Sequence, residues 1–115
     1  RYDPKSKLYW TLSNYIPQEV KAANAGKNPA SLRNTQALFS SKDLRKWDLR
    51  RIVLQHPESI KHGFQYVDWL FEGKNIVFLS RTAFDDGVGG AHNNHDANYL
   101  TFHRIRKFRK IPILE

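Results

Sequence analysis

The chain contains no cysteine, which excludes disulfide bridges and thiol chemistry and leaves the redox state of its compartment open. No apolar run reaches the length needed to cross a bilayer, so we expect no membrane partner. Helical periodicity is also weak along all 115 residues. These absences favour a chain built mainly from strands.

Strand patterns are frequent. Short stretches rich in β-branched and aromatic residues alternate with Gly, Pro, Asn, Asp and Ser, which are the residues that bound strands. The stretches that we expect to be strands are residues 8–13, 35–40, 47–54, 65–71, 75–82 and 98–105. The pattern predicts an all-β fold.

These strands repeat as a group. Residues 9–14 match residues 76–81 at an offset of 67 (76 minus 9). Residues 37–40 and 44–47 match residues 98–101 and 105–108 at an offset of 61 (98 minus 37). A repeating unit of roughly sixty residues with four antiparallel strands is typical of a β-propeller blade.

The repeat divides the chain into two predicted units. Residues 1–54 form a partial blade without its first strand, and residues 55–115 form a complete blade with a long loop at 83–97. A propeller ring commonly closes with four to eight blades, so it is incomplete here. Further blades or self-association must therefore cover the open edges. Because the chain begins without Met and in mid-pattern, we expect a fragment that is inactive alone.

The stretch SSKDLRKW, residues 40–47, carries a resemblance to known proteins. It is similar to the Ser-x-Asp-x-x-x-Trp turn in propeller glycosidases and close to the sialidase Asp-box, although it is one residue shorter and has Arg45 where glycine is expected. Ser41 and Asp43 are expected to form hydrogen bonds within the turn, and Trp47 to pack between sheets. The motif is structural rather than catalytic.

The wider sequence resembles a bacterial sialidase-like family of propeller proteins. The matching runs are NPASLRNTQALFSSKDLRKW, KHGFQYVDWLFEG, SRTAFDDG and GGAHNNHDAN. The resemblance implies part of a secreted or periplasmic, exo-acting glycoside hydrolase that cleaves terminal glycosidic bonds of a glycan substrate without a cofactor. One alternative is a propeller that binds carbohydrate without cleaving it, and another is a basic nucleic-acid-binding module.

Blade topology predicts where the chemistry lies. In a four-stranded blade, the connections between strands two and three lie on the same face as the connections between blades. Residues 15–34, 55–64 and 83–97 are the long connections that fall on this face. Long loops on a rigid scaffold are common places for binding and catalytic residues.

Four aspartates are candidate catalytic carboxyl groups, because glycoside cleavage needs a carboxyl near the leaving oxygen. Asp85, Asp86 and Asp96 lie in the 83–97 loop, where plain turn formation is the alternative role. Asp68 alternates with Tyr66 on the innermost strand and is expected to be half-buried near the axis, in a catalytic or structural role.

Arginine and imidazole side chains are candidate substrate-binding groups. Arg33 and Arg81 flank strands at the predicted loop face, and a guanidinium group matches a carboxylate in two hydrogen bonds. The candidates from the other two connections are His62, Gln65, His92 and His95, with His56 beside them. The tyrosine nucleophile that the resemblance implies is unplaced, since nothing in the sequence marks Tyr66 or Tyr99.

His92, His95 and Asp96 form an H-x-x-H-D pattern. These groups could bind Zn²⁺, but a glycine-rich loop imposes no ligand geometry, and hydrogen bonds to sugar hydroxyls would use the same atoms. We therefore expect no metal.

The net charge is +8, and residues 103–110 hold five of the cations. Such a run can bind nucleic acid or an anionic glycan. Its aromatic residues follow a strand pattern rather than a base-stacking platform, so we favour a solvated strand end over a nucleic-acid partner.

Overall fold

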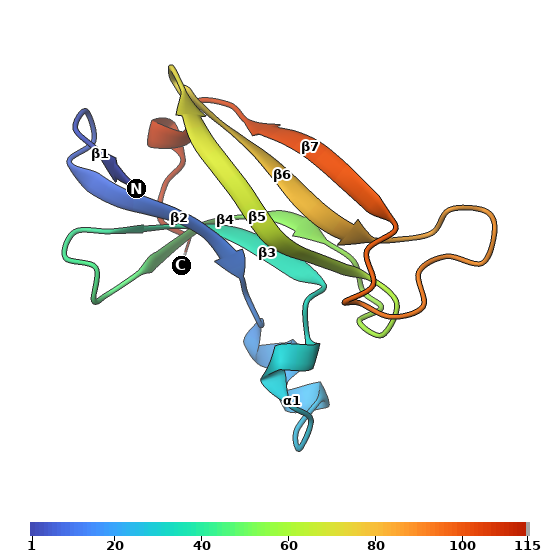
Figure 1. The fold of residues 1–115 in the computed structure, drawn as a ribbon. Helices are drawn as coiled ribbons and strands as arrows, with labels where there is room; N and C mark the ends of the chain where they lie inside the picture. Colours follow the sequence, from blue (N-terminus) through green and yellow to red (C-terminus); the bar gives the residue numbers. More distant parts are fainter. Residues whose placement is uncertain (115) are drawn as a thin grey trace.

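The computed structural model describes residues 1–114 as two antiparallel sheets (Figure 1). The first sheet has the order β1 (Tyr2–Asp3), β2 (Leu8–Asn14), β3 (Thr35–Ser41) and β4 (Asp48–Gln55). The second has the order β5 (Gly63–Glu72), β6 (Asn75–Ala83) and β7 (Tyr99–Ile105). The helical elements are the short α1 (Gln18–Ala23), η1 (Pro29–Ser31) and η2 (Phe108–Lys110). The all-β prediction is confirmed, and within the described residues no helix meets the length and hydropathy of a membrane span.

All six predicted strands are present, but the strand count of each unit differs from the expectation. The first unit does contain an opening strand, since the two residues of β1 pair with β2. The second sheet has three strands within residues 1–114, not four. After β7 the chain turns into η2 because Phe108 is fully buried in the core. The segment that follows reaches the first sheet, where the Leu114 N–H donates to the Leu49 carbonyl at 2.7 Å.

The hydrophobic core lies between the two sheets. Its buried members are Trp10, Leu12, Leu38, Ile76, Phe78, Ile105, Phe108 and Ile111. The Trp10 ring meets the Phe108 ring edge-on, with centroids 5.0 Å apart. Trp47 does not pack between the sheets as predicted, because its side chain is 37% exposed. Trp10 takes that place, since it lies on the inward face of a central strand whereas Trp47 follows a surface turn.

The turn at residues 40–47 forms the hydrogen bonds predicted for it. The Ser41 hydroxyl accepts the Leu44 N–H at 2.8 Å, and Asp43 Oδ1 accepts the N–H groups of Arg45 at 2.8 Å and Lys46 at 3.0 Å. The Lys46 and Arg45 N–H groups hold the pKa of Asp43 below its ordinary value. The carboxylate thus replaces backbone acceptors inside a tight turn.

Asp3 joins the start of the chain to its end. The Arg109 guanidinium donates through Nε to Asp3 Oδ2 at 2.7 Å and through Nη2 to Asp3 Oδ1 at 2.9 Å. Asp3 Oδ2 also accepts from the backbone N–H and the hydroxyl of Ser6. Only 2% of Asp3 is exposed. The Arg109 hydrogen bond is the main reason that the pKa of Asp3 lies well below its ordinary value. The pair therefore fixes η2 against the first sheet.

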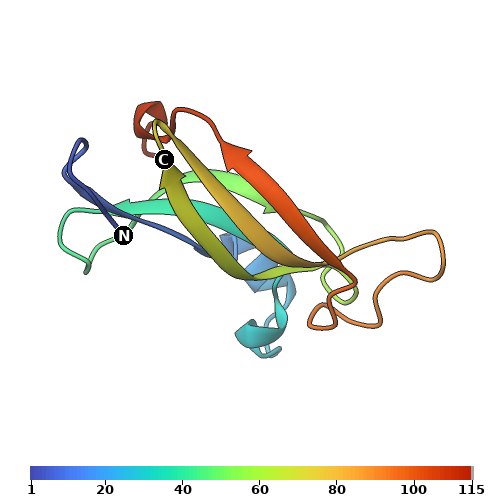
Figure 2. The same cartoon turned by 45° about the horizontal axis from the view of Figure 1, so that its top comes forward.

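The two ends of the sheets differ in construction (Figures 1 and 2). The short turns at residues 4–7, 42–47 and 73–74 lie at one end, which we call the turn end, with η2 beside the β5–β6 turn. The long connections at residues 15–34, 56–62 and 84–98 meet at the other, which we call the loop end. The predicted gathering of the three long connections is confirmed.

Candidate functional site

Asn94 holds the three long connections together at the loop end. Its Nδ2 donates to the carbonyl of Ser31 in the first connection at 2.7 Å and to that of Ser59 in the second at 3.1 Å. Its own carbonyl accepts from Gln65 Nε2. Gly63 permits this approach, because a Cβ atom there would lie 2.7 Å from the Asn94 carbonyl oxygen. One side chain from the third connection thus contacts the other two.

A second link is made by a cluster of imidazoles and carboxylates. His62, only 7% exposed, places Nδ1 at 3.3 Å from Glu58 Oε1 and Nε2 at 3.1 Å from Asp85 Oδ1. The ring of His56 stacks on that of His62 with centroids 3.6 Å apart, and Phe84 meets both rings edge-on. His62 therefore bridges carboxylates from two connections, and one apolar ring shields it.

The geometry of this cluster suits hydrogen bonding better than metal binding. One donor atom from each of His56, His62 and Asp85 lies within 4.8 Å of the others. However, His56 Nδ1 accepts the Glu58 N–H at 3.0 Å, so the neutral ring carries its proton on Nε2, the nitrogen a metal would need. The planes of the two imidazoles are also within 5° of parallel, so their lone pairs do not converge on one ion.

Tyr66 lies at the centre of an exposed polar cluster. The β5–β6 register shifts between Gln65 and Asp68, and Tyr66 in this bulge has a φ of 49°, in the left-handed region. Its hydroxyl lies 3.2 Å from His95 Nε2, and the Arg81 guanidinium carbon lies 5.2 Å from its ring centroid. Bulges re-aim side chains, and strained backbone at a non-glycine residue is frequent at functional sites. The side chain is 61% exposed, so a ligand can reach it.

A polar hollow adjoins this cluster. It has a volume of about 390 Å³. Its lining residues are Arg81, Gly90, Ala91, His92, Asp96, Ala97 and Asn98. A guanidinium and an imidazole beside a carboxyl group can bind an anion and exchange a proton with it. The hollow therefore has the chemistry to hold an acidic group of a ligand.

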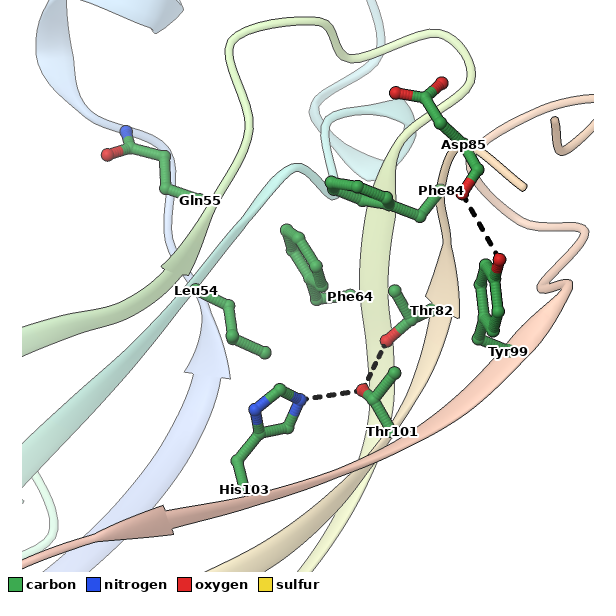
Figure 3. Close-up of a pocket in the computed structure, with 9 residues that line it drawn as sticks. All are labelled: Leu54, Gln55, Phe64, Thr82, Phe84, Asp85, Tyr99, Thr101 and His103. Carbon is green, nitrogen blue, oxygen red and sulfur yellow. Dashed lines mark hydrogen bonds between the residues drawn. The ribbon is translucent and has the colours of Figure 1, made fainter. Parts of the chain in front are cut away.

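A larger pocket, of about 420 Å³, lies between the sheets near the same end (Figure 3). Its residues are Leu54, Gln55, Phe64, Thr82, Phe84, Asp85, Tyr99, Thr101 and His103. The Thr101 hydroxyl lies 2.8 Å from the Thr82 hydroxyl and 2.7 Å from His103 Nε2 (Figure 3). Burial lowers the pKa of His103, which favours the neutral ring. Apolar walls with a few hydroxyl groups can accommodate one face of a sugar ring.

The four candidate carboxyl groups have different surroundings. Asp85 and Asp96 are exposed at the loop end and line the two pockets. Asp86 Oδ1 accepts the N–H groups of Val88 and Gly90, which hold its pKa below the ordinary value, so this side chain closes the loop's own turn and is poorly suited to act as an acid. Asp68 is exposed in mid-strand rather than half-buried, because its side chain points to the outer face of the second sheet.

The candidate substrate-binding residues also separate into two groups. Arg81, His92 and His95 are exposed and lie around the Tyr66 cluster and the polar hollow. The remaining three brace the connections. Arg33 Nε donates to the Ala30 carbonyl at 2.7 Å, Gln65 is 2% exposed, and His62 is enclosed between its carboxylates. The prediction of Gln65 as a rim residue is wrong in position, because its side chain points inward toward the Asn94 carbonyl.

Sequence reasoning missed three residues of this surface. The sequence predicts Tyr66 as an ordinary strand residue, because no local signal reveals a bulge in β5. Glu58 contacts His62, four positions further along the chain, and Asn94 contacts Ser31, 63 positions earlier. The only available signal was the density of polar side chains in the three long connections.

Comparison of the chain with models of known protein families, with curated proteins and with solved structures finds no match. The described residues show a loop end that gathers two pockets and an exposed tyrosine, histidine and arginine cluster.

Proposed function

We propose that the chain is part of a sialidase-like β-propeller glycoside hydrolase that acts on a glycan with a terminal acidic sugar. The observation that carries this proposal is the exposed cluster of Tyr66, His95 and Arg81 at the loop end. The sequence resemblance and the gathering of the three connections support it.

Arg81 is the proposed binding group for the substrate carboxylate. No ion pair involves its guanidinium within residues 1–114; it lies over the Tyr66 ring and lines the polar hollow. Its planar fork can donate two parallel hydrogen bonds to a carboxylate. A carboxylate held there would place the sugar beside the Tyr66 hydroxyl, which favours an acidic sugar over a neutral one.

Tyr66 and His95 are the proposed nucleophile and base. A hydroxyl within hydrogen-bond reach of an imidazole can transfer its proton to that base as it attacks. Sialidases also use a tyrosine as the nucleophile. In this scheme the Tyr66 oxygen bonds to the anomeric carbon, His95 Nε2 receives the phenol proton, and the Asp96 carboxyl group, which lines the same hollow as Arg81, protonates the leaving oxygen. In the second step the Asp96 carboxylate takes a proton from water, the resulting hydroxide bonds to the anomeric carbon, and His95 returns its proton to the departing Tyr66 oxygen.

The proposal also includes the arrangement of the two sheets as neighbouring propeller blades. Two antiparallel sheets pack face to face with their long connections at the same end, as neighbouring blades do. In a complete ring, other blades would supply further contacts to the substrate. The chain alone is therefore expected to bind the acidic sugar weakly without turning it over.

Binding to two matched sugars tests the proposal. In ¹H–¹⁵N titrations of the whole chain, sialyllactose should shift amide signals of residues 66, 81 and 90–98, and lactose should not. Arg81→Gln should weaken binding by roughly tenfold, the loss expected for a charged hydrogen bond, whereas Tyr66→Phe should leave it nearly unchanged. Equal shifts with both sugars, or no effect of Arg81→Gln, would contradict an acidic-sugar site.

Glycan binding without cleavage is the second candidate function. It is favoured by the three expected site residues that brace the loops instead of facing a ligand, namely Asp86, Gln65 and His62. Incubation of the complete ring with an aryl sialoside separates the two, because cleavage through Tyr66 would add the mass of one glycosyl group to the tyrosine. A complete ring that binds the sugar and never gains this mass is a binding module.

A further inference from the structure

A small pocket at the turn end is lined by four cationic residues and by no acidic one: Lys74, Lys107, Arg109 and Lys110. Its volume is about 220 Å³. It lies beside the β5–β6 turn and η2, at the opposite end of the sheets from the loop-end site (Figure 1). Its occupancy is therefore independent of the proposed activity.

Backbone hydrogen bonds hold together the two segments that carry these cations. Lys107 has a φ of 50°, and its N–H donates to Asn75 Oδ1 at 3.1 Å. The next N–H, that of Phe108, donates to the Lys74 carbonyl at 3.2 Å. The Phe108 ring is fully buried and stacks on Phe71. These hydrogen bonds and the buried Phe108 ring thus hold the backbones of the two lysine-bearing turns beside each other.

The charges in this pocket are only partly balanced. Arg109 is paired with Asp3, which occupies its Nε and Nη2. The ion pairs of residues 1–114 include none of Lys74, Lys107 and Lys110. Like charges brought together destabilise the folded state, and an anion bound among them would remove that repulsion.

The donor types indicate which anion fits. Because Arg109 already uses its fork on Asp3, the pocket does not offer a second carboxylate the planar, two-bond match that guanidinium gives. Three ammonium groups are point charges with rotatable donors, and they suit a tetrahedral group with oxygens in several directions. The only aromatic ring next to these residues in sequence, Phe108, is buried, so no base-stacking surface accompanies them.

We infer that this pocket binds the sulfate or phosphate group of a monoester. Sulfate and phosphate monoesters share the same chemistry, a tetrahedral oxyanion on a single ester bond. The pocket holds one such group, whereas a nucleic acid would need a track of cations along the backbone.

Calorimetric titration of the whole chain at low ionic strength tests this inference, with glucosamine 6-sulfate, glucose 6-phosphate and unsubstituted glucosamine as probes. Binding of either ester and not of glucosamine is expected, and the tighter ester identifies the source. Lys74→Gln, Lys110→Gln and Lys107→Asn, which retains a residue that tolerates positive φ, should each raise the Kd by about tenfold. Lys42→Gln, an exposed lysine of another turn, is the matched control and should leave the Kd unchanged.

Two results would overturn the inference. The first is ester binding that the three pocket substitutions and Lys42→Gln weaken equally, because this would show only diffuse attraction to a basic chain. The second is tighter binding of a single-stranded oligonucleotide that Lys74→Gln weakens, because the pocket would then be part of a nucleic-acid surface. Circular dichroism of each variant, matched to the unsubstituted chain, confirms that a lost signal reports the pocket and not unfolding.

Discussion

The turn end and the loop end are held together by different kinds of contact. The turn end is closed by buried rings, with Trp10 and Phe108 both fully buried, and by the Asp3–Arg109 ion pair. The loop end is closed by single polar contacts, chiefly those of Asn94 and His62. Burial of aromatic rings contributes several times the free energy of one hydrogen bond. The comparison indicates that the turn end supplies stability and leaves the loop end free to carry polar chemistry.

Buried polar atoms without a hydrogen-bond partner also distinguish the loop end from the turn end. Three buried side-chain oxygens, Thr35 Oγ1, Gln36 Oε1 and Gln65 Oε1, have no hydrogen-bond partner among the described residues. All three belong to strand residues next to the long connections. Buried polar atoms without partners are costly and are commonly found near functional sites. The loop end is therefore the less stable of the two.

Removal of a ring at the turn end should have the largest effect. Phe108→Ala is expected to lower the free energy of unfolding by about 3–5 kcal/mol, because it leaves a cavity between Trp10 and Phe71. Urea unfolding measures the change. Phe102→Ala, on a side chain that is 59% exposed, is the control and should cost far less. Equal losses for the two would contradict a core centred on Phe108.

Breaking the ion pair at the same end should have the next largest effect. Asp3→Asn leaves Arg109 without its partner and should lower the free energy of unfolding by about 2–3 kcal/mol at pH 7. The pKa of Asp3 is below its ordinary 3.8 in the folded chain, so its contribution is complete above pH 3.8 and is lost as the pH falls below that value. Unfolding curves at pH 7 and at pH 2 should show that the difference in unfolding free energy between the unsubstituted chain and Asp3→Asn is smaller at pH 2. A difference that stays the same at both pH values would contradict a stabilising Asp3–Arg109 ion pair.

The smallest effect concerns His103 near the loop end. Burial holds its pKa below the ordinary 6.5, so the folded chain resists protonation and loses stability as the pH falls through and below 6.5. His103→Asn removes this titration, so its Tm should fall less between pH 7 and pH 5 than that of the unsubstituted chain. The difference should be a few degrees at most. His92→Asn, an exposed histidine, should retain the slope. The account is contradicted if both variants retain it.

The sequence predicts local features of this fold well and distant contacts poorly. The six strands and the bonds of Ser41 and Asp43 depend on neighbouring residues, and both are present as expected. Blade topology also placed the three long connections at one end. The bulge at Tyr66 and the three contacts of Asn94 depend on partners far along the chain, which no local pattern encodes. For the same reason Gln65 and Trp47 were given the wrong surroundings.

Amide hydrogen exchange on the whole chain tests most directly whether the loop end is one assembled surface. If Asn94 joins the three connections, Asn94→Ala should speed exchange in residues 28–34, 56–65 and 90–98 together, and leave residues 3–10 and 72–76 at the turn end unchanged. Faster exchange confined to residues 90–98 would show that the connections are independent loops, and the proposed site would lose its structural basis.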